Sequence, residues 1–138
     1  MKTYTTNYFD HFIEVAPDTK RTQGTKPPSR GDQRTIAEMQ YEMIAKNPYG
    51  YTSDEVLFQV FADRSGLVPE EYGPARERFF SKGQACLRAS PLTKSYGFGI
   101  HSDSRGKIAL YGMETPQYQK FLEDPKLKKE KAMKSSRK

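Results

Sequence analysis

The sequence predicts an α+β fold, in which an antiparallel sheet of three to four strands packs against three to four helices. Helical spacing and helix-start signals gather in residues 35–83, whereas alternating patterns and a hairpin turn signal gather in residues 84–112. Such segregation of helices and strands is typical of α+β proteins. The length of 138 residues fits one domain. We expect that domain to span residues 1–125, with a mobile loop at 19–33, and residues 126–138 to form a disordered basic tail.

The first half of the chain contains a strand, the loop and a helix. A short strand is expected over residues 12–16, because apolar side chains alternate there with a charged one. Residues 19–33 contain almost no apolar side chain and are punctuated by glycine and proline, which predicts the loop. A capping box at residues 35–38 then begins a helix, which the Asn-Pro pair at residues 47–48 ends.

Two further helices are expected next. A second capping box, at residues 52–55, begins the first of them. Its apolar stripe consists of Val56, Leu57, Val60 and Phe61. We expect this stripe to be buried, because the sheet needs cover on one face; the alternative is that the stripe serves a partner. The following helix begins at Pro69 or, because Gly73 interrupts it, at Pro74, and it ends before Gly83.

Strand patterns replace helical ones in the last part of the domain. Strands are expected over residues 84–90 and 94–102, and a returning strand over residues 107–112. Residues 103–106 (DSRG) form the turn between the last two strands, with glycine ready for a positive φ. Thr115 and Pro116, an N-cap followed by proline at the first helical position, begin the last helix.

The positive net charge lies almost entirely at one end of the chain. Residues 126–138 hold seven basic side chains and one acid, which equals the net charge of +6 of the whole protein. A weak contact with polyanions through this tail is therefore the only partner that the charge suggests. The N-terminus lacks the apolar region of a secretory signal, and no apolar run is long enough to cross a membrane. With a single cysteine, these features predict a cytoplasmic protein.

Three segments of the chain resemble a known family. They are residues 5–18, residues 47–64 and residues 79–112, the last of which contains FFSKGQACLRASPL and YGFGIHSD. They are similar to a family of small bacterial proteins of unknown function, and the resemblance covers most of the chain outside the 19–33 loop. It implies a bacterial, cytosolic setting. It supplies no activity, ligand or catalytic residue.

Cys86 is the first candidate for chemistry. A nucleophilic thiol needs a cation, a base or a helix N-terminus close by. Arg88 lies two residues further on, His101 lies on the neighbouring predicted strand, and Asp103 would orient that histidine as in a catalytic triad. The pattern thus predicts Cys86, His101 and Asp103 as catalytic residues if these strands pair. The alternative, which we expect, is that Cys86 is a small buried core residue.

A second group of residues suggests ligand contacts. The run from Lys94 to His101 matches half of the RNA-recognition strand signature, in which Tyr96 and Phe98 would stack on bases. Packing of these two rings in the core is the expected outcome. The predicted ligand-binding residues are Arg88, Lys94, Tyr96, Tyr49 and Tyr51.

These observations favour a small cytosolic, non-enzymatic module that binds a partner or a small ligand. It is preferred because the sequence contains no catalytic signature. One alternative is a thiol- or histidine-dependent enzyme that uses Cys86 and His101. Another is a nucleic-acid binder that uses the basic tail. Neither His11 nor His101 has the spacing of a metal site, so no metal and no cofactor is predicted.

Overall fold

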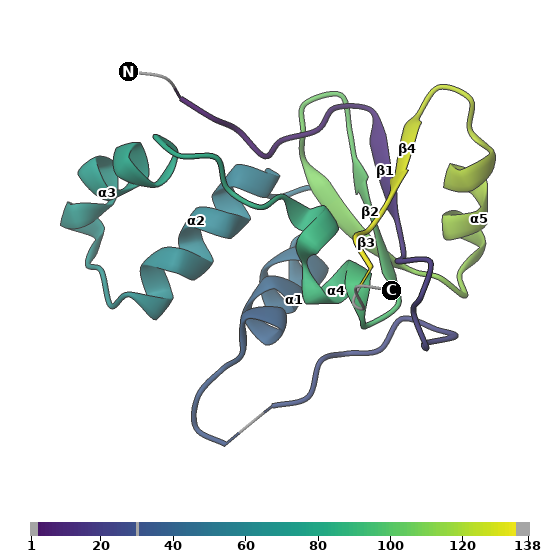
Figure 1. The fold of residues 1–138 in the computed structure, drawn as a ribbon, viewed down its shortest axis with the longest axis horizontal. Coiled ribbons are helices and arrows are strands. Elements are labelled where there is room, and N and C mark those ends of the chain that lie inside the picture. The colour runs from purple at the N-terminus through teal and green to yellow at the C-terminus, as the bar shows by residue number, and fades with distance from the viewer. Residues whose placement is uncertain (1–2, 30, 135–138) are drawn as a thin grey trace.

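The computed structural model describes residues 3–29 and 31–134, and it shows an α+β fold built on one four-stranded sheet (Figure 1). The strands lie in the order β3-β2-β1-β4. Their bounds are His11–Glu14 for β1, Phe98–Ser102 for β2, Ile108–Gly112 for β3 and Lys128–Lys131 for β4. The predicted α+β class is confirmed. The sheet is mixed and not purely antiparallel, because β1 and β4 run parallel.

Strands β2 and β3 form the predicted hairpin. Ile100 lies opposite Leu110 in its register. The N–H of Gly106 donates to the carbonyl oxygen of Asp103 at 3.1 Å and closes the turn. Gly106 has a φ of 81°, which is why glycine is needed at this position.

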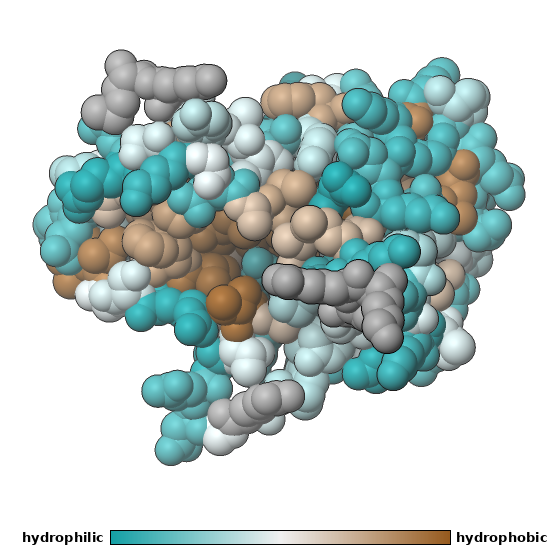
Figure 2. Space-filling model, in the orientation of Figure 1, coloured by the Kyte–Doolittle hydropathy of each residue, from teal (hydrophilic) through white to brown (hydrophobic). Residues whose placement is uncertain are grey.

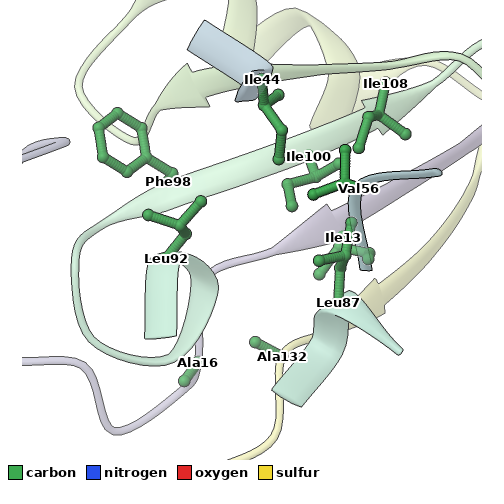
Figure 3. Packing of buried hydrophobic residues seen from close by; sticks show 10 residues of the cluster. All are labelled: Ile13, Ala16, Ile44, Val56, Leu87, Leu92, Phe98, Ile100, Ile108 and Ala132. Atoms are coloured by element: carbon green, nitrogen blue, oxygen red, sulfur yellow. The ribbon is translucent and has the colours of Figure 1, made fainter. Parts of the chain in front are cut away.

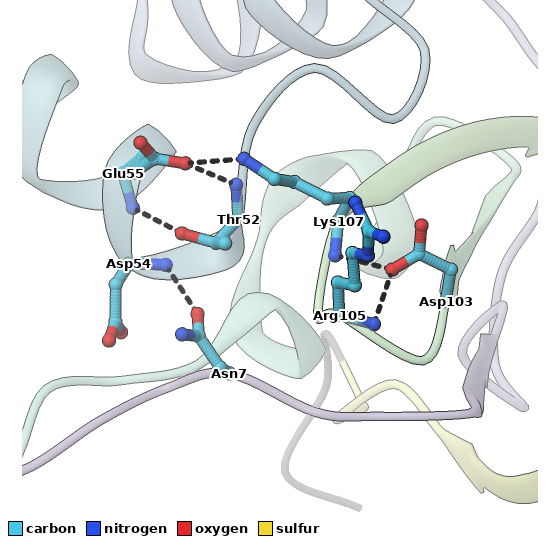
Figure 4. A network of polar contacts seen from close by, with 7 residues as sticks. All are labelled: Asn7, Thr52, Asp54, Glu55, Asp103, Arg105 and Lys107. Atoms are coloured by element: carbon cyan, nitrogen blue, oxygen red, sulfur yellow. Dashed lines mark hydrogen bonds and ion pairs between the residues drawn. The ribbon is translucent and has the colours of Figure 1, made fainter.

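Polar contacts join this hairpin to the start of α2 (Ser53–Arg64), as Figure 4 shows. The Asp103 carboxylate accepts the backbone N–H groups of Arg105 and Lys107, each at 2.9 Å. The Lys107 ammonium lies 3.6 Å from the Glu55 carboxylate. Glu55 also completes the predicted capping box with Thr52. The contact between Lys107 and Glu55 therefore ties the turn to the start of α2, and Glu55 serves both this contact and the cap of the helix.

Strand β4 corrects the prediction of a disordered tail. Residues 128–131 pair in parallel with β1 along the whole length of that strand. Strand β4 lies at an edge of the sheet, where lysine side chains can remain in contact with water while the backbone is paired. Any contact of this segment with polyanions would therefore come from a sheet edge. Residues 135–138 of the predicted tail lie outside the described residues.

Helices α1, α2 and α4 cover one face of the sheet (Figure 1). Helix α1 spans Ile36–Lys46 and α4 spans Pro91–Lys94, and the 3₁₀ turn η2 precedes α4 at Leu87–Ala89. Their apolar side chains meet those of the strands in the main core, shown in Figure 3. This core consists of Ile13, Ala16, Ile44, Val56, Leu87, Leu92, Phe98, Ile100, Ile108 and Ala132.

Helix α5, at Pro116–Glu123, covers the opposite face of the sheet (Figure 1). It begins as predicted, since the Thr115 hydroxyl accepts the N–H of Tyr118 at 3.2 Å. The ring of Phe12 packs against Tyr118 and Phe121. Within residues 3–29 and 31–134, none of the helices combines the length and the apolar character that a membrane crossing requires.

Two predicted strand segments adopt other structures. Residues 84–90 contain η2 and pair with no strand, so the prediction of a strand there is wrong. The predicted strand over residues 94–102 begins only at Phe98, because residues 91–94 form α4 and Gly97 has a φ of 79°. The buried hydroxyl of Thr93, in α4, donates a hydrogen bond to the carbonyl oxygen of Leu87, in η2, at 2.8 Å and so holds these two short helical turns together.

Helix α3 spans Tyr72–Phe79, directly after the 3₁₀ turn η1 at Pro69–Glu71. The predicted start at Pro74 is therefore wrong, whereas Pro69 begins the 3₁₀ turn that runs directly into α3. Pro74 is tolerated because the N–H groups of the first helical turn have no intrahelical acceptor. Helix α3 packs on α2, where Phe58, Ala62, Ala75 and Phe80 form a second, smaller core.

The predicted loop contains neither helix nor strand over residues 19–29. Its backbone is bonded to the body of the protein. The N–H of Gly24 donates to the Glu114 carboxylate, and the N–H of Thr25 donates to the carbonyl of Tyr96, both at 2.8 Å. Residue 30 lies outside the described residues, and the mobility of the loop stays a prediction.

Candidate functional site

The structure does not bring the predicted catalytic residues together. Cys86 is half-buried, and its Sγ lies 3.3 Å from the hydroxyl oxygen of Tyr8. The Nδ1 of His101 lies 2.8 Å from the hydroxyl oxygen of Tyr49. Asp103 holds the hairpin turn through backbone N–H groups. The contacts of Cys86 and His101 thus belong to two separate clusters.

The first cluster connects Cys86 to β4. The ring of Tyr8 stacks on the ring of His11, with centroids 4.1 Å apart. Nε2 of His11 lies 3.0 Å from one carboxylate oxygen of Glu130, and the guanidinium of Arg88 lies 3.4 Å from the other. Burial and the contact with Cys86 raise the pKa of Tyr8. Arg88, the cation that the sequence suggested for Cys86, thus forms an ion pair with the Glu130 carboxylate.

No sequence signal identified Tyr8, His11 and Glu130. His11 and Glu130 are 119 positions apart and meet only because β1 pairs with β4. The cluster ties the C-terminal strand to β1 with an ion-paired carboxylate. Its clearest role is therefore to hold the edge of the sheet.

The second cluster lies around His101 on the α5 side of the sheet. The hydroxyl of Tyr49 lies 2.8 Å from both Nδ1 of His101 and the hydroxyl of Tyr111. The ring of Phe121 stacks on that of His101 at 4.3 Å. Tyr49 has a φ of 59°, which is strained for an aromatic residue. Burial and the contact with Tyr111 raise the pKa of Tyr49, so its hydroxyl stays protonated at neutral pH.

The two histidines give a prediction for the pH dependence of stability. Burial lowers the pKa of His11 and of His101 below the ordinary value of 6.5, and it outweighs the nearby carboxylates. In the unfolded chain both rings take up a proton near pH 6.5, whereas the folded rings resist it, so their contribution is complete above that pH and is lost as the pH falls below it. The free energy of unfolding, measured by urea denaturation, should decrease between pH 8 and pH 5.5.

The double variant His11→Asn/His101→Asn serves as the control for this prediction. It should show a much flatter dependence in the same interval, because the other described side chains with a shifted pKa are tyrosines, whose pKa is raised, and glutamates, whose pKa is lowered. A wild-type protein whose stability is constant from pH 8 to pH 5.5 would contradict the lowered pKa values.

The remaining predicted ligand contacts are scattered over the fold. Lys94 ends α4. Tyr96 packs beneath the guanidinium of Arg21, which lies 5.4 Å from its ring centroid. Tyr51 lines a groove between α1, α2 and α3. In the part of the chain that the structure describes, no group of three or more His, Cys, Asp or Glu side chains is placed to hold a metal ion.

Helix α2 exposes a side chain that the sequence assigned to the core. Successive residues are about 100° apart around a helix, so Val56 and Phe58 point to different sides. Val56 enters the main core, while Phe58 enters the small core with α3. Phe61 lies between these two faces and is 39% exposed. The prediction that the whole stripe is buried is therefore wrong for Phe61. Helix α2 is covered on two faces, and Phe61 lies on the uncovered strip between them.

An apolar groove follows this uncovered strip between α2, α3 and the segment after α3. It consists of two adjoining hollows of about 390 and 380 Å³, which share Phe61, Phe79 and Gln84. The first hollow extends to Ile36, which is 41% exposed, and the second extends to Leu67. Figure 2 shows hydrophobic side chains gathered over α2 and α3, on the left of the view. We call this surface the α2–α3 groove.

The rim of the α2–α3 groove carries only positive charge. Its lining includes Arg64, Arg78 and Lys82, and it includes no carboxylate. Among the described residues, these three side chains form no ion pair. The α2–α3 groove therefore combines an apolar floor with three cationic side chains that form no ion pair within the described part of the protein.

A family model described as a family of unknown function (DUF6157) matches residues 2–138. No curated protein and no solved structure matches the chain.

Proposed function

We propose that this chain, which belongs to the family of unknown function DUF6157, is a non-enzymatic module that binds a protein partner through the α2–α3 groove. The observation that carries this proposal is the exposure of Phe61 on the floor of a groove whose rim is entirely basic. Exposed apolar floors with polar rims are characteristic of protein interaction sites.

The charge of the rim selects the partner. Arg64, Arg78 and Lys82 attract carboxylates and repel basic segments. The two adjoining hollows suit apolar anchors spaced along one side of a helix. The proposed occupant is therefore an acidic amphipathic helical segment, with apolar side chains in the hollows and glutamate or aspartate toward the rim.

Two synthetic peptides test this proposal. Both carry leucine and phenylalanine at positions i, i+3, i+4 and i+7, one with glutamate and the other with lysine elsewhere. Fluorescence anisotropy should show binding of the acidic peptide and little binding of the basic one. Phe61→Ser should weaken binding of the acidic peptide about tenfold or more, since an aromatic anchor at the centre of an interface carries much of the affinity. Phe9→Ser removes a 57% exposed ring outside the groove and should change nothing.

Three results would overturn the proposal. Equal binding of both peptides would mean that the basic rim does not select the partner. Unchanged binding by Phe61→Ser would place the contact elsewhere. Sedimentation that shows a wild-type dimer and a monomeric Phe61→Ser variant would make a second copy of the chain the occupant.

A further inference from the structure

A second groove, on another side of α2, has a different chemical character. This interhelical groove lies between α1, α2 and α3 and has a volume of about 620 Å³. That volume is within the range of small-molecule sites, about 300–1,000 Å³. Its floor is apolar and includes Met39 and Phe58, which are 8% and 5% exposed, together with Met43. The flexible methionine side chains can adapt to different apolar ligands.

Four charged side chains line the interhelical groove, and the fold neutralises two of them. Arg34 lies 2.8 Å from Glu42. Glu55 pairs with Lys107 at 3.6 Å. These two residues are therefore already occupied by contacts within the protein.

The other two charges are a carboxylate and a guanidinium that do not pair with each other. Asp63, on α2, accepts a hydrogen bond from the amide of Gln59 at 2.8 Å, and the same amide donates to the hydroxyl of Tyr72 at 3.2 Å. Arg76, on α3, lies over the rings of Phe58 and Phe80, 5.8 and 5.0 Å from their centroids. Within the described residues, neither Asp63 nor Arg76 forms an ion pair.

We propose that the interhelical groove binds a small zwitterionic molecule with an apolar body, namely an apolar amino acid or a short peptide with free ends. The ligand carboxylate pairs with Arg76, whose guanidinium is held in place by two rings and matches the planar geometry of a carboxylate. The ligand ammonium pairs with Asp63, which Gln59 orients. The apolar body lies on Phe58 and the two methionines. This site is separate from the α2–α3 groove, and either proposal can fail without the other.

Methyl NMR spectroscopy with four probes tests the inference. The probes are L-phenylalanine, N-acetyl-L-phenylalanine (no ammonium), L-phenylalaninamide (no carboxylate) and the dipeptide Leu-Leu. L-phenylalanine or Leu-Leu should shift the methyl signals of Met39 and Met43. The methyl signals of Met113 and Met133, which do not line the groove, should stay in place. The tighter binder of these two probes identifies the length of the ligand.

Variants then separate the two charges. Arg76→Gln should weaken L-phenylalanine and its N-acetyl derivative about tenfold, as expected for a lost charge-assisted hydrogen bond, and leave the amide unaffected. Asp63→Asn should weaken L-phenylalanine and the amide but not the N-acetyl derivative. Arg76→Lys, which keeps the charge, should restore part of the affinity, and Arg105→Gln on the hairpin turn should have no effect.

The inference is overturned if neither L-phenylalanine nor Leu-Leu shifts the Met39 and Met43 signals. It is also overturned if the three phenylalanine derivatives bind equally, or if Arg76→Gln and Asp63→Asn affect all of them alike. Circular dichroism of each variant shows whether the fold is retained, and Arg76→Lys provides the test of charge if Arg76→Gln is destabilised.

Discussion

Replacing Phe12 with alanine is expected to lower the free energy of unfolding by about 3–5 kcal/mol. Phe12 is 0% exposed and joins β1 to α5. Its ring packs edge-on against Tyr118 and stacks on Phe121, with centroids 5.1 and 5.2 Å away. Truncation would remove the contacts of β1 with these two rings of α5 and leave a cavity between them. Urea denaturation followed by far-UV circular dichroism measures the effect.

The matched control is Phe9→Ala, three residues earlier. Phe9 is 57% exposed, so its removal should change the free energy of unfolding by no more than about 0.5 kcal/mol. If Phe12→Ala lowers the free energy of unfolding as little as Phe9→Ala does, the packing of α5 on the sheet does not depend on Phe12.

Replacing Gly97 with alanine is the second change with a large expected effect. Gly97 has a φ of 79°, a conformation that costs a residue with a side chain about 1–3 kcal/mol. An added Cβ would also overlap the carbonyl oxygen of Gln23, in the loop that crosses the start of β2. Crowding of this kind adds about 1–3 kcal/mol. The loss of stability should be accompanied by faster hydrogen exchange at the amide of Thr25, which is bonded to Tyr96.

Gly66→Ala separates the two contributions. Gly66 has a similar φ of 69°, but nothing lies within 4 Å of an added Cβ. This variant should therefore lose only the backbone part, about 1–3 kcal/mol, without the added cost of crowding. Equal losses at Gly66 and Gly97 would mean that the loop yields without cost, and that its contacts do not stabilise the fold.

Features with a local cause could be predicted from the sequence. Thr35, Thr52 and Thr115 cap helices as expected, because a capping hydroxyl needs only the N–H groups that follow it. The hairpin turn at Asp103 to Gly106 also has a local cause. The turn consists of four residues and needs a positive φ at its last one, which glycine adopts readily. These signals were sufficient for the α+β class.

Features that depend on distant partners could not be predicted. Residues 84–90 alternate like a strand but find no partner, whereas Lys128–Lys131 show no apolar pattern and yet form a strand. A segment forms a strand only if another strand has a free edge to pair with it. The sequences of these two segments do not indicate which of them reaches the free edge of β1.

The functional surfaces were decided in the same way. Three features followed from the sequence alone: the Val56 to Phe61 stripe of α2, the single thiol at Cys86 and the concentration of positive charge near the C-terminus. The exposure of Phe61 and the separation of Cys86 from His101 depended on how the elements pack. Periodicity states which side chains share a face, whereas burial depends on which other element covers that face.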